Sequence, residues 1–307
     1  NPETDWKGYH TLDQLPQVKN PVSNMMQNTN TTPFFASMSE SDAKEENYPN
    51  YMVREGDNAR SRNARRILNK YPTFDFATWE RESLDTTMME WNRSKPLLMA
   101  AFAKANEEQV AKLAPVIAHL DDWDGISNLE NTQATIYANW LDGLYVGTLK
   151  GYEAPQEELI PMLETVVDRL VADWGTWQVA WGELNRYQRP NLDLKGNPVF
   201  SDDEPSIPAP GITGRTGGSH IDNGTRTTKT KRRYKIGGNS YTAVVHFPTD
   251  ENNPIKSRSI HTFGANVDPN SPHNMDQAKL LSKSQYKDAW LYLDDVKKNA
   301  KRSYHPG

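Results

Sequence analysis

The middle of the chain, over about residues 57–185, carries apolar residues at the spacing of amphipathic α-helices. The clearest apolar stripe consists of Leu159, Leu163, Val166, Val167, Leu170 and Val171. Asn106 followed by Gln109 has the form of a capping box, and Asp57 and Thr73 are candidate caps of two further helices. Prolines inside this block are expected to start helices or to kink them. The pattern predicts an all-helical region.

Two segments rich in proline flank the helical block, at residues 1–53 and 190–233. Proline, asparagine and glycine favour turns and extended backbone, so irregular structure is expected in both segments. Within the first, the threonine-rich stretch 25–32 predicts a strand that runs into a loop. Strands are also predicted over 240–247 and 257–263, and helices over 276–281 and 284–300.

Composition predicts a folded chain with a thin core. Nine tryptophans argue against disorder, but hydrophobic residues make up 36%, below the roughly 45–50% that is typical. The mean hydropathy is −0.82. We therefore expect that some apolar surface of this chain packs against another polypeptide. The net charge of −5 offers no general attraction to nucleic acid or to an anionic membrane, and the absence of cysteine excludes disulfides and thiolate metal sites.

General catalytic and metal-binding motifs are weak in this sequence. Seven histidines are scattered, and none forms a helical H-E-x-x-H pair. Ser271, His273 and Asp276 have the residue types of a catalytic triad. Because neighbours this close in sequence rarely assemble a triad, a turn that opens a helix is the preferred interpretation.

Two further clusters have a structural and a functional interpretation each. The basic run 226–235 could contact nucleic acid, but in an acidic chain a solvated edge or hairpin beside the following strand is preferred. Tryptophans in the helical block could line an apolar pocket, although core packing is the default expectation. These tryptophans are Trp79, Trp91, Trp123, Trp140, Trp174, Trp177 and Trp181.

One resemblance is stronger than any of these motifs, and it spans nearly the whole chain. The segments that carry it are, in order, Asp5-Trp6-Lys7-Gly8, Leu15-Pro16-Gln17-Val18, Asn20-Pro21, Gln27-Asn28-Thr29-Asn30-Thr31-Thr32-Pro33, Trp123-Asp124-Gly125, Trp181-Gly182-Glu183-Leu184-Asn185-Arg186, Gly238-Asn239-Ser240-Tyr241, Asp268-Pro269-Asn270-Ser271-Pro272-His273 and Asp276-Gln277. Together they resemble the penicillin acylase family of N-terminal nucleophile hydrolases. The sixth and eighth segments resemble its acyl-homoserine lactone and aculeacin acylase branch.

The resemblance implies an α+β fold, part of a layered αββα hydrolase core with a helical arm. The chain is similar to the later part of the large subunit of such enzymes. Residues 1–53 would then be a strand and loop segment of the core that carries the oxyanion asparagine. Residues 54–195 would form a helical region, and 196–307 would supply the loop, strands and C-terminal helices that complete the core.

The same resemblance implies an amidohydrolase whose precursor cuts itself and frees an N-terminal serine as nucleophile. That serine is expected outside this chain, which begins at Asn1. The remaining part of the processed precursor, with the small subunit, is therefore the expected partner in a heterodimer. The favoured substrate is an acyl-homoserine lactone, which would imply quorum quenching. A penicillin or other β-lactam is the alternative substrate, and a non-catalytic binding module derived from the family is the alternative role.

Two site residues follow from the resemblance by position. Asn30 lies three residues before Pro33, where the family places the asparagine whose amide helps to form the oxyanion hole. An amide suits that task because it is a neutral donor that does not titrate. Its NH₂ group is expected to point into a cleft that a second polypeptide segment completes. Without the resemblance, a turn residue in a loop at a strand edge is the preferred interpretation of Asn30.

Arg60 lies six residues before Arg66, at the offset of an active-site arginine in the family. It falls in the first turn of a predicted helix, where the helix dipole disfavours positive charge, so another group is expected to hold it there. Arg62 is the competing candidate, and a solvated helix face is the structural alternative.

The resemblance also bears on cofactors and location. Some relatives bind calcium, but no ligands can be matched in this sequence, so no cofactor is expected. Family members are typically exported, which implies a periplasmic or secreted protein. No nucleic-acid or membrane partner is expected.

Overall fold

The computed structural model of the chain describes residues 7–144, 154–227, 229–301, 303 and 305. Contacts between Cα atoms divide the chain into two compact units, Asn1–Pro72 and Thr73–Gly307. The predicted boundaries after residues 53 and 195 concern segments of a larger hydrolase core and stay predictions. Residues 5 and 6 of the first family segment lie outside the described residues.

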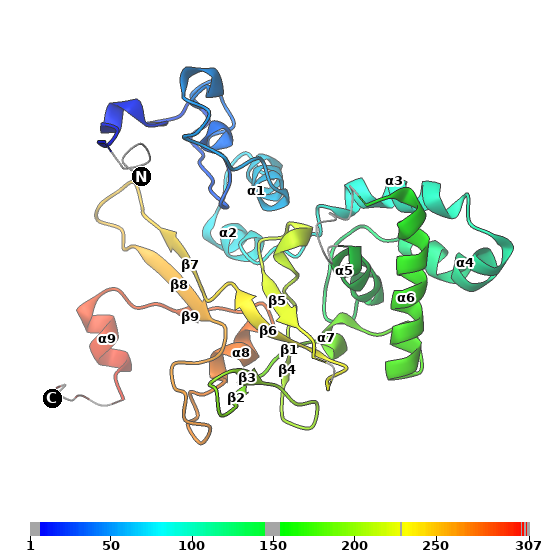
Figure 1. Ribbon diagram of the computed structural model, residues 1–307. Helices are drawn as coiled ribbons and strands as arrows, with labels where there is room; N and C mark the ends of the chain where they lie inside the picture. The colour runs from blue at the N-terminus through cyan, green and yellow to red at the C-terminus, as the bar shows by residue number, and fades with distance from the viewer. Residues whose placement is uncertain (1–6, 145–153, 228, 302, 304, 306–307) are drawn as a thin grey trace. The chain divides into compact units, whose positions relative to one another are not determined.

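The described part of the unit Asn1–Pro72 consists of turns, short 3₁₀-helices and one α-helix (Figure 1). These elements are η1 (Leu12–Gln14), η2 (Pro33–Phe35), η3 (Glu45–Asn47) and α1 (Ala59–Lys70). The prediction of a strand over 25–32 is wrong. Asn30 has a left-handed φ of 54°, which a strand does not accommodate, and Thr32 caps η2 by accepting a hydrogen bond from the Phe34 backbone N–H.

Helix α1 confirms the predicted helix, but its cap is one residue later than predicted. Asn58 is the N-cap, and its side chain accepts a hydrogen bond from the Ser61 backbone N–H at 3.0 Å. Asp57 instead accepts two hydrogen bonds from Arg65, at 2.9 and 2.7 Å. Both residue types are good caps, so the sequence alone did not distinguish them.

Helices come first in the described part of the unit Thr73–Gly307. They are α2 (Phe76–Glu82), α3 (Trp91–Phe102), α4 (Glu107–Asp121), α5 (Thr132–Leu144) and α6 (Gln156–Trp174). The capping box at the start of α4 is confirmed. The Asn106 side chain accepts a hydrogen bond from the Gln109 backbone N–H, and the Gln109 side chain accepts one from the Asn106 backbone N–H. Helix α2 is capped by Asp75 rather than by Thr73.

Helices α3 to α6 enclose the larger hydrophobic core (Figure 1). Their apolar faces meet there, with Leu98, Leu113, Leu141 and Leu163 fully buried. The expected core role of the tryptophans holds for Trp91, Trp123, Trp140 and Trp181, which are buried, whereas Trp79 is exposed. Pro96, Pro115 and Pro161 lie inside α3, α4 and α6.

The chain then changes from helix to strand. Helix α7 (Trp181–Leu184) leads into β1 (Asn185–Tyr187), which belongs to a sheet of order β4-β1-β6-β5. The partners are β4 (Ile207–Pro208), β5 (Asp222–Thr225) and β6 (Arg233–Gly238). Strand β1 is parallel to β6 and antiparallel to β4, and a register shift between Asn223 and Gly224 marks a bulge in β5.

A second sheet, of order β7-β8-β9, contains the predicted strand pair. Its strands are β7 (Tyr241–His246), β8 (Lys256–His261) and β9 (Lys287–Asp288), and β2 (Asn191–Leu192) and β3 (Pro198–Val199) form a separate pair. Helix α8 (Asp276–Leu281) confirms the predicted helix. The predicted helix over 284–300 is wrong in its first half, because Ser284 has a left-handed φ of 53° and Tyr286 is buried. Only α9 (Leu293–Asn299) is helical there, and it buries none of its residues.

The described residues of the basic run 226–235 belong to the expected hairpin, formed by the antiparallel strands β5 and β6, but they are partly interior rather than solvated. Arg233 and Lys235 are each only 5% exposed. Lys235 Nζ lies 2.6 Å from a carboxylate oxygen of the fully buried Asp222, and Arg233 lies 3.1 Å from Asp142. A buried charge must be paired, and these acids neutralise the two cations within the chain. Both cations are therefore not available to bind nucleic-acid phosphates.

Candidate active site

Asn30 lies in a tight turn just before η2. Its backbone N–H donates to the Asn28 side-chain oxygen at 2.9 Å, which is the geometry of an Asx turn. Asparagine tolerates the left-handed φ of 54° better than most residues, so the sequence suits this backbone. Thr31 continues the anchoring by donating its hydroxyl to the Gly56 carbonyl at 2.9 Å. The turn thus holds the Asn30 side chain at a fixed place on the unit Asn1–Pro72.

Asn58, the cap of α1, ties this turn to the start of the helix. Its Nδ2 donates to the Thr29 carbonyl at 3.0 Å and to the Asn30 carbonyl at 3.1 Å. Its Oδ1 caps α1 and also accepts from the Thr29 hydroxyl at 3.3 Å. One amide therefore joins a segment and a helix that are about thirty residues apart in sequence, with its donors and its acceptor all in use.

The two residues expected at the site lie side by side. Arg60 Nη2 donates to Asn30 Oδ1 at 3.0 Å. A guanidinium can only donate, so the Asn30 atom that faces it must be the oxygen. The Asn30 Nδ2 group therefore points away from Arg60. Among the described residues, Nδ2 has no hydrogen-bond partner.

Arg62, the competing candidate, lies elsewhere. Its Nη1 donates to the Asp57 carbonyl at 3.3 Å and lies 3.8 Å from the Asp57 carboxylate. The same carboxylate forms an ion pair with Arg65, which also donates a hydrogen bond to the Ser61 hydroxyl. Burial acts to raise the pKa of Asp57, but the hydrogen bonds and charge of Arg65 outweigh it and lower that pKa. These contacts pin the first turns of α1, and Arg60 is the arginine that reaches Asn30.

Exposure limits what this pair can do in the chain as described. Asn30 is exposed and Arg60 is half-buried, so the described residues of Asn1–Pro72 do not enclose the Asn30 amide in a cleft. A fixed, neutral amide with a free N–H is suited to stabilising negative charge on an oxygen. That effect is strong only where water is excluded, which needs further protein around Asn30.

Sequence reasoning missed Asn58, although a signal was present. Asn58 precedes the helical pattern directly and is as good a cap as Asp57. Its bonds to Thr29 and Asn30 could not be read from spacing, since they depend on how the turn folds back.

The other chemical candidates are structural. His273 Nδ1 lies 2.9 Å from an Asp276 carboxylate oxygen at the start of α8, which fits a turn that opens a helix. Both side chains are exposed. Within the described part of the chain, no group of three or more His, Asp or Glu side chains could hold a metal ion. Among the described helices, none combines the length and the hydrophobicity of a membrane-spanning segment.

The family model described as penicillin amidase matches residues 1–298. The chain belongs to this family. It is also similar to a solved structure described as thermostable penicillin G acylase from Alcaligenes faecalis in orthorhombic form, with a TM-score of 0.54 and 15% sequence identity. The similarity covers 98% of this chain and 60% of that chain, so this member spans less than two thirds of the length of that acylase.

The structural similarity confirms the predicted fold class. This penicillin amidase family member has the α+β fold of an N-terminal nucleophile hydrolase. Residues of several segments that carry the resemblance have structural roles in the fold. Asn185 is fully buried and donates to the Ala209 and Gly211 carbonyls, and Arg186 donates to the Gly182 carbonyl at 2.8 Å.

Gly238 shows the same structural role in another family segment. Its φ is 103°, and a Cβ there would lie 2.2 Å from the Ile221 carbonyl oxygen. Only glycine fits such a close approach of two backbones. The segment Gly238-Asn239-Ser240-Tyr241 therefore supports the family assignment through the fold and does not identify a substrate.

Proposed function

We propose that this chain is part of an amidohydrolase that cleaves the amide bond of an acylated small molecule. The observation that supports this best is the contact of Arg60 with the Asn30 oxygen at 3.0 Å, which leaves the Asn30 NH₂ as a directed donor. Membership of the penicillin amidase family supports the same reaction class.

In this proposal the nucleophile is an N-terminal serine outside the chain. Its own α-amino group, with an unperturbed pKa of about 7.7–8.0, takes the hydroxyl proton near neutral pH. The serine oxygen bonds to the amide carbon, the carbonyl oxygen gains negative charge, and the amine leaves with the proton. Water then releases the acid from the acyl-enzyme. Asn30 Nδ2 donates to the oxyanion in both steps, and Arg60 is a positioning residue that holds Asn30.

We propose an acyl-homoserine lactone as the substrate. The segments Trp181-Gly182-Glu183-Leu184-Asn185-Arg186 and Ser271-Pro272-His273 support it, because they resemble that branch of the family. A β-lactam such as penicillin is the alternative, supported by the description of the similar structure as a penicillin G acylase. Turnover of an acyl-homoserine lactone and of penicillin G by the same preparation distinguishes the two substrates.

The proposal also includes the rest of the protein. The processed precursor would supply the nucleophile segment and the small subunit, in a periplasmic or secreted heterodimer. The exposed position of Asn30 in this chain instead favours a second candidate, a non-catalytic binding module derived from the family. A serine at a processed N-terminus in the complete protein supports the enzyme, and its absence supports the module.

The direct test is Asn30→Ala in the complete protein. Removing one oxyanion donor typically costs about 10²–10³ in kcat, and we expect a loss of that size with little change in folding. Asn24→Ala is the matched control, because Asn24 is also an exposed asparagine of this unit with a φ of 54°. Normal turnover by Asn30→Ala, or equal losses in both variants, would contradict the assignment.

A further inference from the structure

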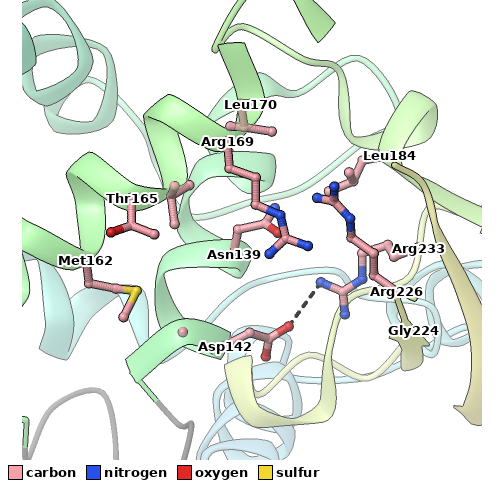
Figure 2. A pocket seen from close by; sticks show the side chains of 12 residues that line it. Asn139, Asp142, Met162, Thr165, Arg169, Leu170, Leu184, Gly224, Arg226 and Arg233 are labelled. Carbon is pink, nitrogen blue, oxygen red and sulfur yellow. Dashed lines mark hydrogen bonds and ion pairs between the residues drawn. The ribbon is translucent and has the colours of Figure 1, made fainter. Parts of the chain in front are cut away.

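A pocket lies within the unit Thr73–Gly307, between helices α5 and α6 and the strands β5 and β6 (Figure 2). Its volume is about 270 Å³, near the lower end of the range for small-molecule sites. The lining includes Asp142, Met162, Val166, Arg169, Arg226 and Arg233. It includes neither Asn30 nor Arg60, and the proposed function makes no use of it.

Three arginines and one aspartate supply the charge of this lining. Arg233 donates to an Asp142 carboxylate oxygen at 3.1 Å, the contact that Figure 2 marks with a dashed line. Arg226 is paired with Asp173, at the last turn of α6. Figure 2 shows the guanidinium groups of the three arginines gathered near one another. Positive charge therefore exceeds negative charge in the lining.

Arg169 differs from the other two arginines. Among the described residues it has no hydrogen bond or ion pair, although it lies on α6 one turn before Asp173. Burial lowers the pKa of Arg169, and the positive charge of Arg226 lowers it further, with Asp173 opposing. Like charges that face each other across a partly enclosed space destabilise one another, and an anion between them relieves that repulsion.

Apolar side chains form the rest of the pocket. Val166, Leu170 and Leu184 line it and are buried, and the flexible Met162 lies beside them. A phosphate or sulfate ion would leave this apolar wall uncovered. A carboxylate with a short hydrocarbon chain would place its charge at the arginines and its apolar atoms on the wall.

We propose that this pocket binds a small organic carboxylate with a short apolar chain. The planar guanidinium of Arg169 matches the two oxygens of a carboxylate and would donate to them directly. Arg226 contributes positive charge beside it, and Met162 and Val166 contact the hydrocarbon. The binding site is independent of the proposed amide hydrolysis, so either proposal can fail without the other.

The test uses hexanoate as the probe and the methyl group of Met162 as a local reporter. The complete protein is labelled with ¹³C at the methionine methyl groups, and the Met162 signal is assigned with Met162→Leu. We expect hexanoate to shift that signal saturably, and the neutral amide hexanamide to leave it unchanged at the same concentration. No Met162 shift with hexanoate, or equal binding of hexanamide, would overturn the proposal. Tighter binding of inorganic phosphate than of hexanoate would overturn the carboxylate assignment.

Charge variants complete the test. Arg169→Gln should weaken hexanoate binding about tenfold or more, because a hydrogen bond to a charged group is lost. Arg54→Gln is the matched control: it removes one positive charge from an exposed side chain outside this lining, and binding should be unchanged. Arg169→Lys keeps the charge but not the planar fork, and should bind with intermediate affinity. Equal binding by Arg169→Gln and wild type would overturn the proposal.

Discussion

At the residue scale, one contact orients the candidate catalytic amide. Arg60 donates a hydrogen bond to the Asn30 oxygen, so the NH₂ group of that amide remains to donate to a substrate. An arginine in the first turn of a helix is unfavourable for the helix dipole, and the Asn30 oxygen offsets that cost. The sequence predicted that some group would hold Arg60, and the structure identifies it.

This orientation predicts a double-mutant result. Arg60→Ala in the complete protein should lower kcat roughly 10- to 100-fold, because the Asn30 amide is then free to turn its oxygen toward the substrate. In the Asn30→Ala background the same change should have little further effect, since no amide remains to be oriented. The measurement is kcat and KM for the four proteins of the cycle. If the losses of kcat in the two single variants multiplied in the double variant, Arg60 would not act through Asn30.

The neighbouring ion pair predicts a pH dependence of stability. Arg65 lowers the pKa of Asp57 despite its burial, so the folded pKa lies below the unfolded value of about 3.9. The stabilisation is then complete above that value and is lost as pH falls through the folded pKa. Asp57→Asn should lower the free energy of unfolding at pH 7, measured by urea unfolding. The deficit should shrink toward zero near pH 2, and an equal deficit at both pH values would contradict the pairing.

At the scale of elements, the N-cap of α1 makes hydrogen bonds outside its helix, and the N-cap of α4 does not within the described part of the chain. Both Asn58 and Asn106 cap their helices through the side-chain oxygen. Asn58 also donates to the Thr29 and Asn30 carbonyls, whereas Asn106 belongs to a local capping box. The start of α1 therefore positions the turn that carries the candidate site.

The two caps predict different outcomes for the same substitution. Asn58→Ala and Asn106→Ala should each cost about 1 kcal/mol of stability, the usual loss for an N-cap. Only Asn58→Ala should also lower kcat, because it releases the Asn30 turn. Thermal unfolding and turnover of the complete protein measure both effects. If the two variants lost activity equally, the link from α1 to the site would be unsupported.

Sequence patterns predicted elements better than their ends. The capping box of α4 and the apolar stripe of α6 are local patterns, and both were predicted correctly except for Val171, which is exposed. The strand over 25–32 failed because threonine content did not show the left-handed turn at Asn30. The first half of the predicted helix over 284–300 failed because the burial of Tyr286 depends on tertiary packing that periodicity does not contain.

At the scale of the whole molecule, the family resemblance predicted features that local sequence patterns did not. It predicted the α+β fold class, and it selected Asn30 and Arg60, which lie thirty residues apart and are in contact in the structure. Neither hydrophobic spacing nor general motifs predicted that contact, because it depends on a turn and a cap that meet only in the folded unit. The chain spans 60% of the similar penicillin G acylase, and the proposed cleft around Asn30 needs further protein.

The most direct measurement is a crystal structure of the complete protein with an alkylboronic acid bound to its nucleophile, since the adduct imitates the tetrahedral intermediate. We expect the Asn30 Nδ2 group to lie about 2.7–3.1 Å from the boronate oxygen that replaces the oxyanion, enclosed by segments outside this chain. Arg60 should keep its bond to the Asn30 oxygen. An adduct with Asn30 still exposed to solvent and far from that oxygen would contradict the assignment.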